Sequence, residues 1–167
     1  AGGCRGLSEF IVCSRLTSLC RHTARKEVVG KEGARSQRSG GDLGVASVDI
    51  DHFRSVNGTY GSGVGERVIK SLARLLRQRL RGADVIGRMG GEEFAAILPE
   101  SGLEQAAVVF DQIRQAFADI VFHADDATFN VTISCGVADF KTHSTATSLS
   151  DAADKALYAA KHGGRNQ

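Results

Sequence analysis

Two acidic residues follow an apolar run that has the composition of a buried strand. Residues 45–50 read Val-Ala-Ser-Val-Asp-Ile, and Asp51 comes next. Side chains alternate along a strand, so Asp49 and Asp51 are predicted to point to the same side. A carboxylate at the end of an apolar strand is costly to bury unless it is paired or binds a metal. This pair is therefore a candidate for metal binding.

A second acidic pair lies in a predicted hairpin. Glu92 and Glu93 follow Gly90 and Gly91, between two strand-like segments. If this hairpin neighbours the first strand, three or four acids converge on one sheet edge, and such oxygen ligands suit Mg²⁺ completed by substrate phosphates. Mn²⁺ accepts the same ligands. The glycines would let a bulky ligand approach the backbone. For either acidic pair taken alone, an ordinary turn with solvated acids is about as common as a metal site.

The elements that must position these acids alternate along the chain. Hydrophobic patterning predicts strands at 45–50, 84–88, 94–98 and 129–137, and helices at 64–80, 103–117 and 149–161. Strands separated by helices, with one hairpin among them, predict an α/β fold. We expect an α+β sandwich with a central mixed sheet flanked by helices.

The first forty residues differ from the rest. Residues 1–40 carry eight Lys or Arg against three Asp or Glu. Apolar spacing predicts one or two helices between residues 7 and 30, and a Gly, Ser and charge-rich stretch at 30–44 predicts a mobile loop. We therefore expect a basic N-terminal extension, 1–40, and a catalytic domain, 41–167.

Composition limits the class of protein. The 167 residues are 42% hydrophobic and 24% charged, which suits a globular domain. A formal net charge of +2 does not indicate a surface that binds nucleic acid or a membrane. The four cysteines have no metal or disulfide spacing, and no apolar run approaches the roughly 20 residues of a membrane span. We expect a cytoplasmic domain that contacts neither nucleic acid nor membrane.

Five blocks of sequence resemble the GGDEF family of bacterial diguanylate cyclases, in its Gly-Gly-Glu-Glu-Phe form. They occur in the order and spacing of the family and cover about residues 44–166. The blocks are Asp49-Ile-Asp-His-Phe-Arg54 with Asn57, Gly61 and Gly65; Arg88-Met-Gly-Gly-Glu-Glu-Phe94; Val131-Thr-Ile-Ser134 with Gly136-Val137; Ala153-Asp-Lys-Ala-Leu-Tyr-Ala-Ala-Lys161; and Gly164-Arg-Asn166.

The resemblance implies a fold similar to nucleotide cyclases and polymerase palms. It also implies an activity, the condensation of two GTP molecules into cyclic di-GMP with release of pyrophosphate. Each half of a homodimer would hold one GTP, and the 3′-hydroxyl of one would attack the α-phosphate of the other. A sensory or receiver domain in the parent protein would supply the signal.

The family's site residues carry over position by position. Asp49 and Glu92 would bind Mg²⁺ through carboxylates and Ile50 through its carbonyl, while Glu92 would accept the proton with support from Glu93. The substrate-binding positions would be Arg54, Asn57, Glu66, Gly90, Gly91, Lys161 and Arg165, with the three cations near the phosphates and with Asn57 and Glu66 at the guanine edge. Glu66 stands where the family usually has aspartate.

Arg81 and Asp84 match the spacing of the family's inhibitory product site, where they would bind cyclic di-GMP. An arginine that family enzymes often add from the next helix is replaced here by Gln112. The upstream family segment also departs from its pattern at residues 14–22. These departures leave a second hypothesis, a catalytically weak or inactive domain that senses cyclic di-GMP. A third, another nucleotide cyclase or polymerase-like enzyme, is disfavoured by Asn57 and the product-site spacing.

Overall fold

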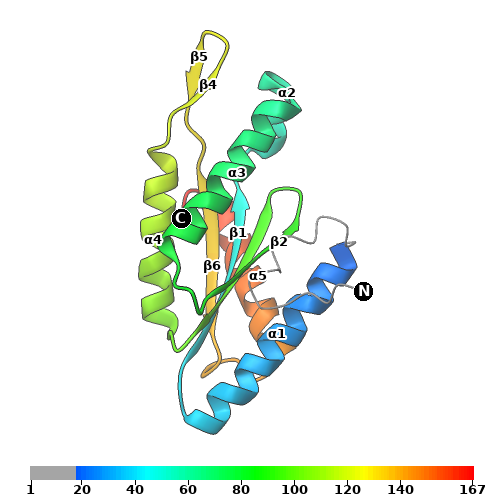
Figure 1. Cartoon of the computed structure of the whole chain (residues 1–167), viewed down its shortest axis with the longest axis vertical. Coiled ribbons are helices and arrows are strands. Elements are labelled where there is room, and N and C mark those ends of the chain that lie inside the picture. The colour runs from blue at the N-terminus through cyan, green and yellow to red at the C-terminus, as the bar shows by residue number, and fades with distance from the viewer. Residues whose placement is uncertain (1–17) are drawn as a thin grey trace.

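The computed structural model describes residues 18–167 of the chain (Figure 1). The first part of the family segment at 14–22, and the helix expected to start near residue 7, fall partly outside the described residues. In chain order the elements are α1 (Ser18–Ser39), β1 (Leu43–Ile50), α2 (Phe53–Tyr60), α3 (Ser62–Arg79), β2 (Val85–Gly90), β3 (Glu93–Pro99), α4 (Leu103–Ala118), β4 (Phe122–Ala124), β5 (Ala127–Phe129), β6 (Ile133–Asp139) and α5 (Ala146–His162).

A four-stranded sheet in the order β2-β3-β1-β6 is flanked by helices, which confirms the α/β fold class. The prediction of a mixed sheet was wrong, because all three pairings are antiparallel. The helices do connect strands of the same direction. However, β3 lies between β1 and β2, and β1 lies between β3 and β6, so strands of the same direction never pair.

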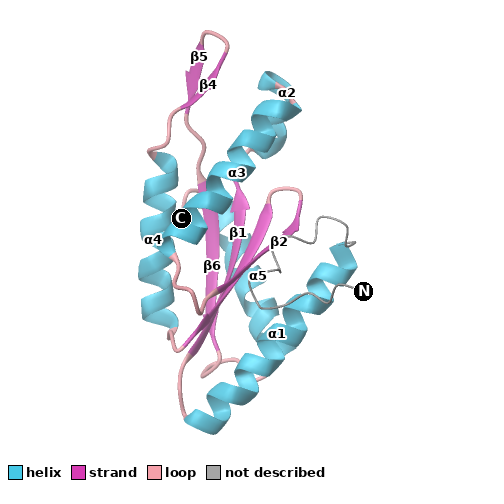
Figure 2. Cartoon of the chain, in the orientation of Figure 1, coloured by secondary structure: helices cyan, strands magenta, loops and turns pink. Residues whose placement is uncertain are grey.

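The sheet is covered on both faces (Figure 2). One core cluster joins the strands to α2, α3 and α4, and a second joins them to α1 and α5. All eight residues of β1 are buried as a result. Asp49 is thus carried into the layer beneath α1 and α5, on the same face of β1 as Val45 and Ser47.

Helix α1 corrects the prediction for residues 30–44. The helix continues to Ser39 and ends before Gly40, whose φ of 71° is left-handed. Its buried stripe consists of Arg25, Val29, Gly33 and Ser36, at helical spacing. Only Val29 is a large apolar residue, so hydrophobic periodicity could not detect this face. The domain boundary at residue 40 stays a prediction, although α1 packs on the sheet.

Other predicted elements lie within a few residues of the observed ones, with two exceptions. The expected strand at 129–137 is divided, because residues 130–132 separate β5 from β6. Helix α2 and the small β4–β5 hairpin were not predicted, since eight and three residues are too short for a clear period. No helix in the described part of the chain has the length and apolar character needed to cross a membrane.

Helix α5 lies directly on β6 at Gly136, where a Cβ would collide with the backbone of Ala153 and Leu157. We expect Gly136→Ala to lower the free energy of unfolding by about 1–3 kcal/mol, because the helix must move off the strand. Urea denaturation would measure the loss. The control is Gly63→Ala in α3, where an added Cβ meets no atom within 4 Å and should stabilise the helix. Equal unfolding midpoints for Gly136→Ala and wild type would contradict this packing.

Candidate active site

The end of β1 and the glycine hairpin lie side by side. The strand register pairs Asp49 with Glu93, and the Ile50 N–H donates to the Glu92 carbonyl at 3.2 Å. The turn is made by Gly91, with a left-handed φ of 39°, and Glu92. The predicted convergence of the two acidic pairs on one sheet edge is therefore observed.

Asp49 is a buried carboxylate beside a cation. It is only 8% exposed, and its Oδ1 lies 3.1 Å from Lys161 Nζ at the end of α5. Within the described residues this oxygen makes no hydrogen bond of good geometry. Burial raises the pKa of Asp49 to about 6, against the opposing effect of Lys161, and the charges of Glu92 and Glu93 raise it further. A carboxylate in this environment gains strongly from a bound cation.

The residues present fit a hard divalent cation. The chain offers the carboxylates of Asp49 and Glu92 and the carbonyl of Ile50 at one edge. Across residues 18–167 no group of three or more His, Cys, Asp or Glu side chains could hold a metal by itself. This donor set suits Mg²⁺, which keeps water and substrate phosphates in its shell instead of an all-protein cage.

Asp51 points to the same side as Asp49, but its carboxylate already accepts hydrogen bonds within the protein. It is 2% exposed and accepts from Thr132 Oγ1 at 2.8 Å, Ser134 Oγ at 2.7 Å and the Asn166 N–H at 3.1 Å. Its Oδ1 lies 3.9 Å from Lys161 Nζ. Asp51 therefore joins β1, β6 and the segment after α5, and it holds the frame in which Asp49 and Lys161 face each other.

Helix α1 closes the site from the other side. Arg25 is 2% exposed; its Nη1 pairs with Asp154 Oδ1 at 2.9 Å and its Nη2 donates to Ser47 Oγ at 2.9 Å. These residues line a cavity of about 400 Å³ together with Asp49 and Lys161. The sequence did not single out Arg25 or Ser47, because neither belongs to a recognised motif.

The predicted guanine-edge residues lie at the junction of α2 and α3. Asn57 Oδ1 is buried and has no hydrogen-bond partner within the described chain. A Cβ at Gly65 would collide with this oxygen, so a glycine is required there. Glu66 is exposed, and its Oε1 lies 3.9 Å from the guanidinium of Arg88.

Arg88 connects this junction to the glycine hairpin. Its Nε donates to the Gly91 carbonyl at 2.9 Å, while its Nη1 faces Glu66. Sequence reasoning missed this link, and the signal for it was the arginine two residues before Gly90. Besides Lys161, the sequence predicted two phosphate-binding cations, Arg54 on α2 and Arg165 after α5. Both of these residues are exposed.

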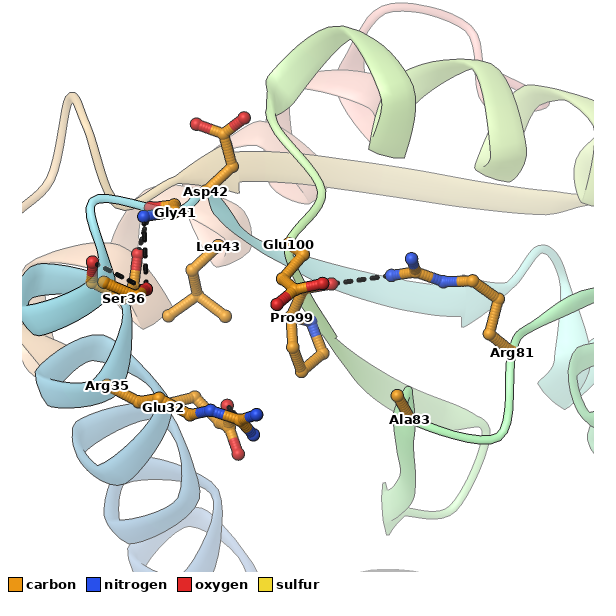
Figure 3. Close-up of a pocket in the computed structure, with 11 residues that line it drawn as sticks. Glu32, Arg35, Ser36, Gly41, Asp42, Leu43, Arg81, Ala83, Pro99 and Glu100 are labelled. Carbon is orange, nitrogen blue, oxygen red and sulfur yellow. Dashed lines mark hydrogen bonds and ion pairs between the residues drawn. The ribbon is translucent and has the colours of Figure 1, made fainter.

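The predicted product-site residues form a local pair. Arg81 Nη2 donates to Asp84 Oδ1 at 3.0 Å and to the Pro99 carbonyl at 2.6 Å, and the Arg81 N–H donates to Asp84 Oδ2 at 2.8 Å. Arg81 borders a cavity of about 210 Å³ opposite Glu32 and Arg35 of α1 (Figure 3). The two predicted product-site residues are thus in contact, and the Asp84 carboxylate is paired with Arg81.

Comparison with known proteins agrees with this arrangement. The family model described as "Diguanylate cyclase, GGDEF domain" matches residues 13–167. Diguanylate cyclase DgcP of Pseudomonas aeruginosa is 40% identical over 152 residues, which are 91% of this chain and 23% of that protein. The chain therefore spans about a quarter of the length of this relative.

Solved structures have the same fold. The GGDEF domain of DgcB from Caulobacter crescentus, in complex with c-di-GMP, has a TM-score of 0.82 and 30% identity, covering 87% of each chain. The active GGEEF domain of a diguanylate cyclase from Vibrio cholerae has a TM-score of 0.79 and 31% identity, covering 86% of this chain and 92% of that one. With the family model matching almost from end to end, this chain belongs to the GGDEF domain family of diguanylate cyclases.

Proposed function

We propose that this domain condenses two GTP molecules into cyclic di-GMP and pyrophosphate. The observation that carries the proposal is the meeting of Asp49, Glu92 and Glu93 at one sheet edge, with Lys161 3.1 Å from Asp49. Family membership and the relatives named above support the same activity.

Asp49, Glu92 and the Ile50 carbonyl would hold Mg²⁺, or Mn²⁺ in its place. The bound ion would neutralise charge on the phosphates and orient them for attack. Glu92 accepts the proton of the attacking 3′-hydroxyl, with Glu93 beside it. A bond forms from that oxygen to the α-phosphorus, the bond to the β-phosphate breaks, and pyrophosphate leaves. Lys161 and Arg165 bind the terminal phosphates, and Arg54 adds charge nearby.

Base recognition falls to the α2–α3 junction. The buried Asn57 Oδ1 is an acceptor in need of a donor, and guanine offers N–H groups on its edge. Glu66 accepts from the same edge, and Arg88 orients it. Gly90 and Gly91 allow the nucleotide to approach the hairpin backbone.

Two copies of the domain are needed, because each holds one GTP and the ring closes only after two reciprocal attacks. Cyclic di-GMP then binds at Arg81 and Asp84 and inhibits the enzyme. The parent protein, through a sensory or receiver domain, controls how the two copies meet. The related DgcB domain was solved in complex with c-di-GMP, which supports binding of the product by this domain.

Glu92→Gln should lower cyclic di-GMP synthesis by at least ~100-fold and preserve the fold, because it removes a metal ligand and proton acceptor from an exposed hairpin. Concentrated protein would be incubated with GTP and Mg²⁺, and the products separated by chromatography. Glu27→Gln, on the exposed side of α1, is the matched control. Undiminished turnover by Glu92→Gln would refute the role of this residue. A wild-type protein that binds cyclic di-GMP without making it would support the sensor hypothesis.

Arg81→Ala should weaken cyclic di-GMP binding and relieve product inhibition. The arginine is the cationic member of this ion pair, and Asp84 loses its partner with it. Calorimetry would give the affinity, and the residual rate at saturating product would give the inhibition. Arg79→Ala, at the end of α3, controls for lost charge. An unchanged affinity would overturn the product-site assignment.

Charged Asp49 costs stability in the metal-free protein. The pKa of Asp49 is raised from 3.8 to about 6, so the protonated carboxyl is the form that stabilises the folded state. This contribution is complete below pH 4 and is lost as the pH rises through 6. Asp49→Asn should therefore raise the free energy of unfolding at pH 7 by about 1–3 kcal/mol, with no gain at pH 4. Urea unfolding in a chelator at both pH values would measure this, with Asp126→Asn in the exposed hairpin turn as control. Parallel pH profiles for Asp49→Asn and wild type would contradict the argument.

A further inference from the structure

Helix α2 cannot position Asn57 by itself. It has only eight residues, and Ser55, Asn57, Gly58 and Thr59 are all poor helix formers. The residue before it, His52, has a left-handed φ of 54° and caps no helix N–H with its side chain. Isolated helices shorter than about 12–15 residues are marginal in water. Contacts with the rest of the protein must therefore hold α2 in place.

At its N-terminal and middle turns, Phe53 and Val56 are buried in the core. At its C-terminal end the contact is aromatic. The Tyr60 ring stacks on Phe129 of β5, with ring centroids 4.1 Å apart and planes within 6°. Phe129 lies 5.7 Å from Phe122 of β4. The row of aromatic contacts extends to α4, because the ring centroids of Phe122 and the fully buried Phe117 are 6.0 Å apart.

The hairpin that carries Phe129 is itself anchored. Asn130 Nδ2 donates to the carbonyl of Ala118, the last residue of α4, at 3.0 Å, and to the Ile120 carbonyl just beyond it at 2.9 Å. From the other side, Arg67 of α3 donates to the His123 carbonyl at 2.6 Å. Figure 1 shows the hairpin and α2 at the same end of the molecule, beyond the sheet. The hairpin therefore gives Tyr60 a fixed surface.

Tyr60 is coupled directly to the recognition residue. It follows Asn57 by three positions, so the two lie on adjacent turns of one helix. The next residue, Gly61, has a φ of 92° and donates its N–H to the Asn57 carbonyl at 2.9 Å. A displacement of Tyr60 would move the turn that closes on Asn57, and Asn57 Oδ1 has no hydrogen bond within the described chain to restrain it.

We propose that Tyr60, stacked on Phe129, is a positioning residue that sets guanine specificity by holding Asn57 in place. The inference rests on the proposed function, since it takes Asn57 as a reader of the base. The β4–β5 hairpin then acts as a brace for base recognition, and the Tyr60 ring, not its hydroxyl, is the group required.

The test measures binding of α,β-methylene GTP, whose α–β linkage the reaction cannot break, and of the matching ITP analogue, which lacks the 2-amino group of guanine. We expect Tyr60→Ala to weaken binding of the GTP analogue at least ~10-fold and to reduce its preference over the ITP analogue. Tyr60→Phe should keep both, because the ring remains. Thr59→Ala, exposed on the same helix, is the matched control and should match wild type.

A structural role alone would lower stability and leave the preference between the two analogues unchanged, so urea unfolding is measured in parallel. Phe129→Ala should reproduce the loss of preference, and combining it with Tyr60→Ala should add little. If Tyr60→Ala does not fold, Tyr60→Leu takes its place. A wild type without preference for the GTP analogue would overturn the proposed base recognition. A wild type with that preference, and a folded Tyr60→Ala or Tyr60→Leu protein that retains it, would overturn this inference alone.

Discussion

The site depends on the burial of one carboxylate at the end of the central strand. Strand β1 is covered on both faces, so Asp49 leaves water when the sheet forms and its pKa rises to about 6. Lys161 offsets only part of that cost. The neighbouring Glu92 and Glu93 add repulsion that a divalent cation would convert into binding energy. The fold thus keeps a carboxylate at this end of the sheet at a cost in stability.

Small residues allow other parts of the site to approach closely. Gly65 leaves room for Asn57, and Gly136 lets the backbone of α5 lie on β6. Because α5 is held this near to the sheet, its last turn brings Lys161 over the end of β1. Close backbone packing, more than any single ion pair, sets the distance between the cation and the acids.

The sequence predicted the strands and the convergence of the acids, because β1 and the hairpin strands have clear apolar runs of strand length. It missed the second half of α1, whose buried face contains Gly33 and Ser36 in place of large apolar residues. It also predicted mixed pairing, since helical connections fix the direction of strands but not which strand inserts between them. The hydrogen bonds of Asp51 and the link through Arg88 depend on neighbours distant in sequence, and local sequence patterns cannot predict such contacts.

The most consequential missed contact is Arg25. It donates to Ser47, two residues before Asp49 on the same face of β1, and pairs with Asp154, seven residues before Lys161 on α5. Seven residues are close to two helical turns, so Asp154 and Lys161 share one face of α5. One buried guanidinium thereby joins α1 to both elements that carry the Asp49–Lys161 pair. Because Arg25 is only 2% exposed, breaking its bonds would leave a buried charge unpaired. Helix α1 is consequently tied to the strand and the helix that form the site.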